Sequence, residues 1–145
     1  SAYAKAGYQC QHNINYWQYG DYLGIGCGAH GKITNSKTQK ILRTVKTKHP
    51  KGYLDESRDF LDQLIEVEES ERPFEFMMNQ LRLHSAFSVE HFQASTGLNI
   101  NVILSKLNIA KQKQLMSCET YNEKTYWQVT KTGQRYLNDL LELFL

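Results

Sequence analysis

Apolar residues recur every three or four positions along residues 70–110, and this spacing predicts three short helices. The first helix is expected to take Ser70 as its cap and to hold Pro73 in its first turn, where backbone N–H groups need no partner. Ser88 is expected to open the second helix, and Gly97 to close it in the left-handed conformation. The stripes of the first and third helices are formed by Phe74, Met77, Met78 and Leu81, and by Ile100, Ile103, Leu104 and Leu107.

Apolar and polar side chains alternate in residues 115–130, which predicts a β-hairpin that turns at residues 121–124. Trp127 and Val129 are expected on its inner face. A last helix should begin at Thr130, with an inner face formed by Leu137, Leu140, Leu141 and Phe144. Three helices, a hairpin and a helix in this order predict a small, mostly helical, winged-helix-like domain in residues 73–145.

Residues 1–50 differ from the rest in composition, because they are rich in glycine, tyrosine and histidine. Two runs in this region, Tyr22–Ile25 and Ile41–Val45, favour extended strands. The pattern shows no amphipathic helix long enough to cover such strands. Residues 1–50 are therefore predicted to be an incomplete unit, and the chain as a whole to be of the α+β class.

The stretch between these regions, residues 51–72, is predicted to be a connector helix. Asp55 can cap it, and the acidic run Glu66–Glu71 is expected to end it as a solvated face. Its apolar face would be formed by Phe60, Leu61, Leu64 and Ile65.

The composition is that of a globular protein, with 41% hydrophobic and 22% charged residues in a chain of 145. Apolar stretches are only a few residues long, so no membrane span is expected. The chain begins without the apolar core of a secretory signal, and Cys10, Cys27 and Cys118 are odd in number and far apart, which favours the cytoplasm. A net charge of +2 does not by itself indicate a nucleic-acid partner.

The run Gly26-Cys27-Gly28-Ala29-His30-Gly31 has the glycine spacing of a dinucleotide-binding loop. A turn sequence follows where that site needs a helix, so these glycines are expected to admit a close ligand or a neighbouring backbone instead. Cys10 and His12 have no second pair at zinc-finger spacing. A cysteine nucleophile, Cys10 or Cys27 with His12 or His30, lacks an orienting partner that the sequence can identify.

The segment His12-Asn13-Ile14-Asn15-Tyr16-Trp17 combines an imidazole with aromatic rings. Imidazole can ligate iron axially, and neighbouring aromatic faces can contact a porphyrin and exclude water. Aromatic residues around a hydrogen-bonded histidine can equally form part of a core. The residues alone leave both interpretations open.

Several segments together resemble the C-terminal part of the heme chaperone HemW family, radical-SAM proteins long described as oxygen-independent coproporphyrinogen III oxidase-like. The specific element is the H-N-x-x-Y-W motif at residues 12–17, which distinguishes the heme-binding members. The other matching segments are residues 7–11, Gly20–Gly31, His49–Leu54, Glu75–Asn79 and Leu137–Phe144.

This resemblance implies a partial α/β barrel that carries a [4Fe-4S] cluster and S-adenosylmethionine, followed by a small C-terminal domain. Residues 1–50 would be the end of the barrel and residues 73–145 the HemN C-terminal domain. The C-x-x-x-C-x-x-C motif that holds the cluster is absent from this sequence. Cluster and S-adenosylmethionine are therefore expected in the full-length protein and not on this chain, while Gly26, Gly28 and Ala29 would lie at the barrel mouth.

The resemblance also implies that the full-length protein binds heme and passes it to an acceptor hemoprotein. His12 would be a ligand or contact of the heme iron, with Tyr16 and Trp17 as further heme contacts. One alternative is oxidase activity of the full-length protein in porphyrin biosynthesis, by a 5′-deoxyadenosyl radical.

A second alternative concerns the winged-helix-like domain, which could contact nucleic acid or another protein. The basic residues available for a nucleic-acid contact are Lys106, Lys111, Lys113 and Lys124. Glu119 and Glu123 dilute this patch, so nucleic acid is not the expected partner.

Overall fold

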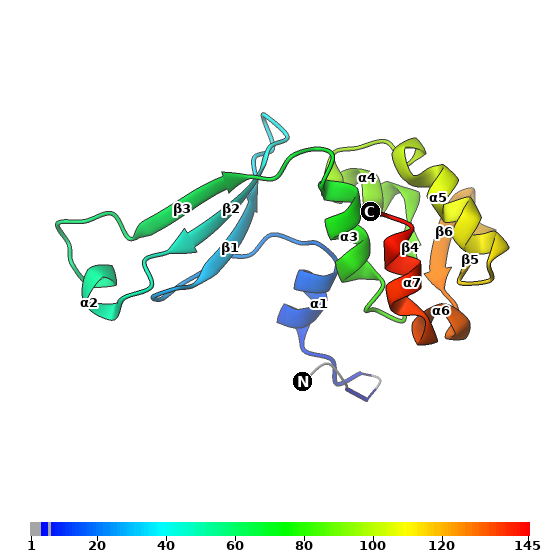
Figure 1. Ribbon diagram of the computed structural model, residues 1–145, viewed down its shortest axis with the longest axis horizontal. Coiled ribbons are helices and arrows are strands. Elements are labelled where there is room, and N and C mark those ends of the chain that lie inside the picture. Colours follow the sequence, from blue (N-terminus) through cyan, green and yellow to red (C-terminus); the bar gives the residue numbers. More distant parts are fainter. Residues whose placement is uncertain (1–3, 6) are drawn as a thin grey trace. The chain divides into compact units, whose positions relative to one another are not determined.

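A computed structural model describes residues 4–5 and 7–145 of the chain (Figure 1). The chain divides into two compact units. One is formed by residues 20–68, and the other joins the residues up to Tyr19 with Glu69–Leu145. This grouping differs from the expected boundary at residue 50, because the first residues of the chain belong with the C-terminal ones.

The unit of residues 20–68 is built on an antiparallel sheet whose strands are β1 (His30–Thr34), β2 (Ile41–Lys46) and β3 (Leu61–Glu66), in that spatial order. A short helix, α2 (Pro50–Tyr53), lies between β2 and β3 in the sequence. The predicted strand over residues 41–45 is confirmed. The strand predicted over residues 22–25 reduces to a single bridge between Tyr22 and Lys32.

The connector helix predicted over residues 51–72 is wrong for most of its length, because residues 61–66 form β3. Leu64 lies opposite Thr44 in the register of β2 and β3. Asp55 accepts hydrogen bonds from the backbone N–H and the hydroxyl of Ser57, which makes a tight turn rather than a helix cap. Pairing with β2 satisfies the backbone of this stretch and overrides its helical spacing.

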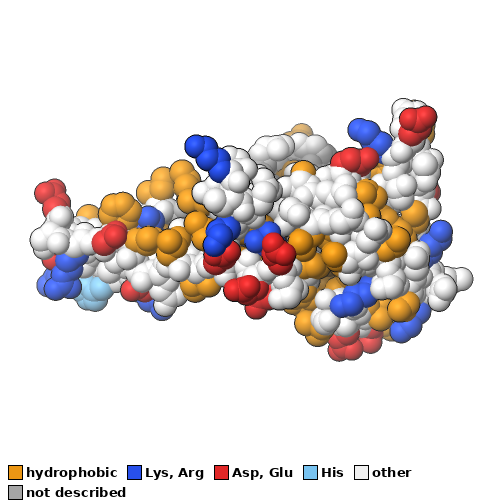
Figure 2. Space-filling model, turned by 90° about the horizontal axis from the view of Figure 1, so that it is seen from above, with side chains coloured by type: hydrophobic (Ala, Val, Ile, Leu, Met, Phe, Trp, Pro, Cys, Tyr) orange, Lys and Arg blue, Asp and Glu red, His pale blue; other side chains and the backbone are white. Residues whose placement is uncertain are grey.

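Apolar side chains of this sheet are exposed to solvent, among them Ile33, Leu64 and Ile65. The register places Ile33 opposite Leu42. Leu64 pairs with Thr44, two residues after Leu42 on β2, and therefore lies on the same face of the sheet. Leu64 is 58% exposed. Hydrophobic side chains gather on the surface over this sheet, in the left half of Figure 2.

The second unit contains most of the helices. They are α1 (Gln11–Trp17), α3 (Arg72–Gln80), α4 (Val89–Thr96), α5 (Asn101–Gln112), α6 (Lys131–Arg135) and α7 (Leu137–Glu142). Strands β4 (Phe87–Ser88), β5 (Met116–Tyr121) and β6 (Lys124–Val129) form an antiparallel sheet in the order β4-β6-β5. From α3 onward the helices and the hairpin follow one another in the predicted order, which confirms a mixed α+β fold.

Phe76 of α3 lies at the centre of the core of this unit. Its side chain is fully buried and meets the rings of Phe87, Phe92 and His91 edge-on, with ring centroids 5.1–5.4 Å apart. Edge-to-face packing of this kind adds to the free energy gained from burial alone. The predicted apolar stripes supply the other core residues, among them Met77, Leu81, Ile103, Leu107, Leu140 and Phe144.

Most of the helix caps predicted for this unit are confirmed. The Ser88 hydroxyl accepts a 3.0 Å hydrogen bond from the His91 N–H, and Gly97 closes α4 with φ 73°. Thr130 caps α6 through the Gly133 N–H. Ser70 does not cap α3, which begins after Glu71 without a side-chain cap.

The hairpin turn and the last helix are set by backbone conformation. Asn122 and Glu123 both have positive φ, 48° and 63°, as the tight turn between β5 and β6 requires. The single helix predicted after Thr130 is divided into α6 and α7, because Tyr136 leaves the helical region with ψ 43°. Among the described residues, no helix is long and apolar enough to cross a membrane.

Candidate functional site

Helix α1 carries the H-N-x-x-Y-W motif and turns its residues toward two different faces. Asn13 and Trp17 are four positions apart and both line a cavity. His12 and Tyr16 are also four positions apart, and both are exposed to solvent. The motif therefore offers an imidazole on an open face and an indole at a cavity wall.

The cavity beside α1 has a volume of about 650 Å³, within the range of small-molecule sites. One wall is α1 with the segment that precedes it, including Tyr8 and Cys10. The opposite wall is the loop after α3, residues 82–85, which includes Arg82 and His84. We call this space the α1 cavity. Two segments about 70 positions apart in the sequence thus form one site.

The C-terminal end of α1 is fixed to the core by Tyr19. This side chain is 2% exposed, and its hydroxyl donates a 2.7 Å hydrogen bond to Oε2 of Glu75 on α3. The His91 Nε2 lies 2.9 Å from the Gln18 carbonyl oxygen, so the imidazole donates to the end of α1 in the tautomer that carries a proton there. These contacts hold Trp17 in place at the cavity wall.

The loop that forms the opposite wall is held from β6 and α6. The His84 carbonyl accepts a 2.7 Å hydrogen bond from the Gln128 Nε2, and His84 Nδ1 lies 2.7 Å from Gln134 Nε2. The Arg82 Nε donates to the Met78 carbonyl at 3.3 Å. The guanidinium is thereby attached at one nitrogen, and its two terminal amino groups remain available for a ligand.

The other predicted site residues belong to a different unit from α1. Gly26, Gly28 and Ala29 lie in the unit of residues 20–68, where Gly26 and Gly28 have φ values of 105° and 68°. Their backbone N–H groups all donate hydrogen bonds within the unit. Gly26 donates to the Tyr53 hydroxyl, Gly28 to the Thr47 carbonyl and Ala29 to the Gly26 carbonyl. A dinucleotide phosphate would need those donors free. A place for these residues at a barrel mouth stays a prediction.

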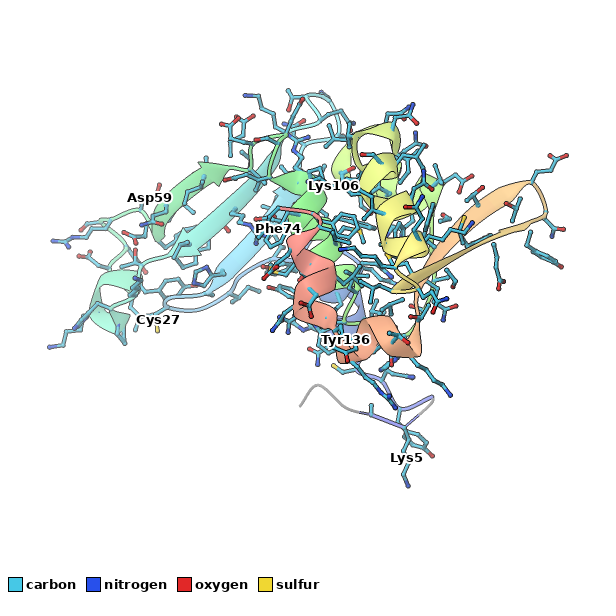
Figure 3. The ribbon with its side chains drawn as sticks, turned by 45° about the vertical axis from the view of Figure 1, so that its right-hand side comes forward. Lys5, Cys27, Asp59, Phe74, Lys106 and Tyr136 are labelled. Atoms are coloured by element: carbon cyan, nitrogen blue, oxygen red, sulfur yellow. The ribbon has the colours of Figure 1, made fainter. Side chains whose placement is uncertain are left out.

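The same loop does show the close backbone approach that glycine permits. A side chain at Gly24 would overlap the His30 carbonyl, and one at Gly31 would overlap the Thr44 hydroxyl. Cys27 is exposed within this loop (Figure 3). The expectation that the glycines of this run admit neighbouring backbone is confirmed at Gly31, where backbone atoms of Gly24 and Tyr22 come within 3.1–3.2 Å of an added Cβ. It is not met at Gly26 and Gly28, where no atom comes closer than 3.8 Å.

Asp21 and Lys32 form the main charged pair of this unit. The Lys32 Nζ is 3.0 Å from Asp21 Oδ1, and the lysine side chain is 3% exposed. Burial raises the pKa of Asp21, but hydrogen bonds from the Thr34 N–H and hydroxyl, together with Lys32, outweigh it and hold that pKa below its ordinary value. This pair stabilises the sheet edge of this unit.

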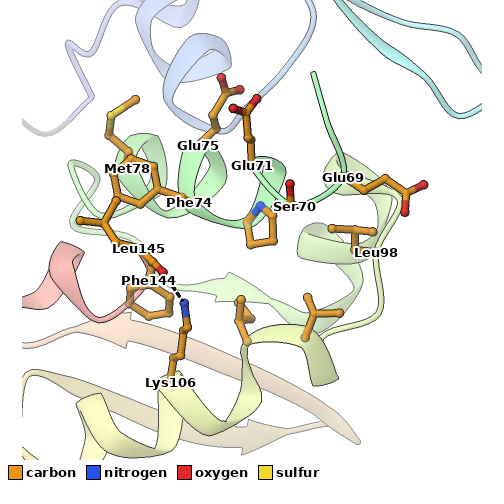
Figure 4. A pocket seen from close by; sticks show the side chains of 13 residues that line it. Glu69, Ser70, Glu71, Phe74, Glu75, Met78, Leu98, Lys106, Phe144 and Leu145 are labelled. Carbon is orange, nitrogen blue, oxygen red and sulfur yellow. Dashed lines mark hydrogen bonds between the residues drawn. The ribbon is translucent and has the colours of Figure 1, made fainter. Parts of the chain in front are cut away.

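A second cavity, of about 780 Å³, lies between α3, α5 and the C-terminal residues (Figure 4). Phe74, Met78 and Ile103 give it an apolar lining, and its carboxylates are those of Glu69, Glu71 and Glu75. Lys106 also lines this cavity, and its Nζ donates a 3.0 Å hydrogen bond to the Leu145 carbonyl. This lysine, counted among the basic residues for nucleic acid, therefore lies in acidic surroundings.

Comparison with known proteins identifies the relatives of this chain. Residues 67–136 match the family model of the HemN C-terminal domain. The heme chaperone HemW of Escherichia coli is 51% identical over the whole chain, and that of Haemophilus influenzae is 48% identical. Over its whole length the chain is similar to the C-terminal region of HemW heme chaperones. It spans 36% of the length of both relatives.

A solved structure supports the fold of this part of the HemW family. The coproporphyrinogen III oxidase HemN of Escherichia coli, described as a radical SAM enzyme, superposes with a TM-score of 0.52. The match covers 86% of this chain and 28% of that protein, at 18% sequence identity. At this identity the likeness establishes the fold alone.

The residues of this chain do not fit an iron–sulfur cluster of the kind that the HemW resemblance implies. Such a cluster needs several cysteine thiolates converging on one point. Cys10, Cys27 and Cys118 lie on different elements, and the described residues contain no group of three metal-ligating side chains. The described residues therefore do not supply the ligand set of such a cluster.

Sequence reasoning missed two features of this site. Helix α1 was not predicted, because it has only seven residues, none of them fully buried, and its N-cap Cys10 makes no side-chain cap hydrogen bond. Arg82 and His84 carried no signal, since they follow the stripe of α3 as ordinary polar residues. Only the tertiary structure brings them to the motif.

Proposed function

We propose that this chain is the C-terminal part of a heme-binding protein in which α1 presents His12 to the heme iron. The observation that carries the proposal is the two-faced arrangement of the motif: His12 is exposed while Trp17 lines the α1 cavity. Iron can approach an exposed imidazole without disrupting core packing, and axial ligation by histidine is common in hemoproteins. Tyr16, on the same face as His12, is a further heme contact.

The proposed role of the full-length protein is to hold heme and release it to an acceptor hemoprotein. Support comes from the relatives, which are named heme chaperones and are about half identical over this region. In that protein a radical-SAM barrel precedes the winged-helix-like domain of residues 73–145. The [4Fe-4S] cluster and S-adenosylmethionine bind elsewhere on the barrel, and the protein functions in the cytoplasm.

Within the residues of this chain His12 lies on the surface of α1, and the proposed role is transfer of heme rather than permanent storage. A prosthetic group that is never released is normally enclosed, since burial excludes water and competing ligands. A ligand on an open helix face can be replaced by a ligand from another protein. The rigid attachment of α1 through Tyr19 and Gln18 keeps the imidazole in position between transfers.

The test is a heme titration of the full-length protein and of its His12→Ala variant, followed at the Soret band. His49→Ala is the matched control, because His49 is also exposed and its side chain makes no cap hydrogen bond. His12→Ala is expected to shift the Soret maximum and weaken binding at least tenfold, while His49→Ala does neither. Unchanged spectra and affinity in His12→Ala would refute the assignment.

The second candidate function is oxidation of coproporphyrinogen III by the full-length protein. It is favoured by the structural likeness to the HemN oxidase, which rests on fold alone. The two functions are separated by porphyrinogen turnover with reduced, cluster-loaded protein. Turnover comparable to that of an oxidase would support the enzyme, and heme binding without turnover would support the chaperone.

A further inference from the structure

We propose that the α1 cavity binds the propionate edge of heme, with the Arg82 guanidinium pairing with a carboxylate and the Trp17 indole lying against the ring. This inference rests on the proposed function and adds the residues that recognise the anionic side of the ligand. It concerns a part of the site that His12, on another face of α1, does not form.

Charge distinguishes the two cavities of this unit. Arg82 gives the α1 cavity a permanent positive charge, and among the described residues that line it there is no carboxylate. The cavity between α3 and α5 carries three glutamates and one lysine. An anionic ligand is therefore favoured in the α1 cavity and disfavoured in the other, since like charges repel and opposite charges attract.

The shape of the lining suits a flat, largely apolar ligand. Trp17 and Tyr8 supply aromatic surface, and Ile14 and Leu83 supply aliphatic surface. Tyr8 is 83% exposed, so a ligand that covers its ring removes apolar area from water. A macrocycle with carboxylates at one edge satisfies both the apolar lining and the single cationic group.

Arg82 lies just after α3, where its side chain is oriented by a hydrogen bond to that helix. Its Nε donates to the Met78 carbonyl at 3.3 Å, which orients the planar guanidinium. The terminal amino groups can then donate two parallel hydrogen bonds to one carboxylate. Arginine is the side chain best suited to such bidentate recognition.

His12 and the α1 cavity are close along the helix axis but lie on different faces of α1. His12 and Trp17 are five residues apart, which corresponds to about 7.5 Å along the helix axis. Iron ligation and carboxylate recognition are in this way assigned to different residues.

The test compares heme with heme dimethyl ester, which lacks the free carboxylates, in the full-length protein. Wild type is expected to bind heme about tenfold more tightly than the ester, because the ester cannot pair with Arg82. Arg82→Ala is expected to lose that preference while keeping the Soret maximum of wild type, since Arg82 does not ligate iron. Arg135→Ala, an exposed arginine that does not line the cavity, is the control and should keep the preference.

The outcomes separate this inference from the proposed function. A wild-type protein that binds heme but binds the ester equally well would overturn the inference and leave the function intact. A wild-type protein that binds neither form would overturn both. The ester comparison in wild type needs no substitution, so it tests the propionate contact even if Arg82→Ala fails to fold. Arg82→Lys keeps the positive charge and should retain part of the preference for heme over the ester.

Discussion

The Tyr19 hydroxyl donates a 2.7 Å hydrogen bond to the Glu75 carboxylate, which joins the segment just after α1 to the first turn of α3. The Tyr19 ring also meets Phe76 edge-on, with centroids 6.2 Å apart. Tyr19 adopts a positive φ of 63°, a conformation that costs free energy for a bulky residue. The hydrogen bond and the packing together offset that cost and hold the motif helix on the domain.

Tyr19→Phe tests this attachment. The ring packing is kept, but the hydrogen bond to a carboxylate is lost, and we expect the free energy of unfolding to fall by about 1–2 kcal/mol. Chemical denaturation of the full-length protein measures the change. Glu75→Gln, which keeps an acceptor for the hydroxyl, should cost less than Tyr19→Phe; an equal or larger loss would contradict this account.

Gly133→Ala tests the close contact between α6 and the strand region. Gly133 is buried, and an added methyl group would overlap the Leu115 carbonyl oxygen, which is backbone and cannot move aside cheaply. We expect a loss of about 2–4 kcal/mol in the free energy of unfolding. Thr132→Ala, at an exposed position of the same helix, is the control and should change stability by less than about 0.5 kcal/mol.

The ion pair of Asp21 and Lys32 predicts a pH-dependent contribution to stability. The pKa of Asp21 is lower in the folded protein than in the unfolded chain, so folding favours the ionised carboxylate. Its stabilising effect is present above the unfolded value of about 4 and disappears as the pH falls through the lower folded value. Protonation of Asp21 therefore destabilises the sheet edge under acid conditions only.

Asp21→Asn is the variant that measures this effect. At pH 7 it should lower the free energy of unfolding by about 1–2 kcal/mol, because the nearly buried Lys32 loses a charged partner. The difference from wild type should shrink as the pH is lowered below 4. A difference that stays constant from pH 7 to pH 3 would show that the ion pair does not carry the stability.

The sequence allowed the C-terminal elements to be predicted because their signals are local. Ser88, Gly97 and Thr130 act through their own backbone neighbours, so cap and turn chemistry could be read without tertiary information. Strand β3 could not be predicted, since its helical spacing of apolar residues is overridden by pairing with β2. The choice between helix and strand there depends on a partner that lies about 20 residues earlier in the sequence.

The candidate site also contains residues that the sequence predicted and residues that only the structure reveals. His12, Tyr16 and Trp17 were found from the motif, but the motif does not say which of them face a cavity. That division follows from the helical geometry of α1, in which positions four apart share a face. Arg82 and His84 enter the site only through the loop after α3, about 70 residues from the motif.

The most direct test of heme ligation by His12 is rescue of His12→Gly with free imidazole. Removal of the side chain leaves the iron without its protein ligand, and added imidazole can occupy the vacated position. We predict that His12→Gly shifts the Soret maximum of the heme-loaded full-length protein and that millimolar imidazole restores the wild-type spectrum. A His12→Gly spectrum identical to wild type before imidazole is added would contradict the claim that α1 presents the iron ligand.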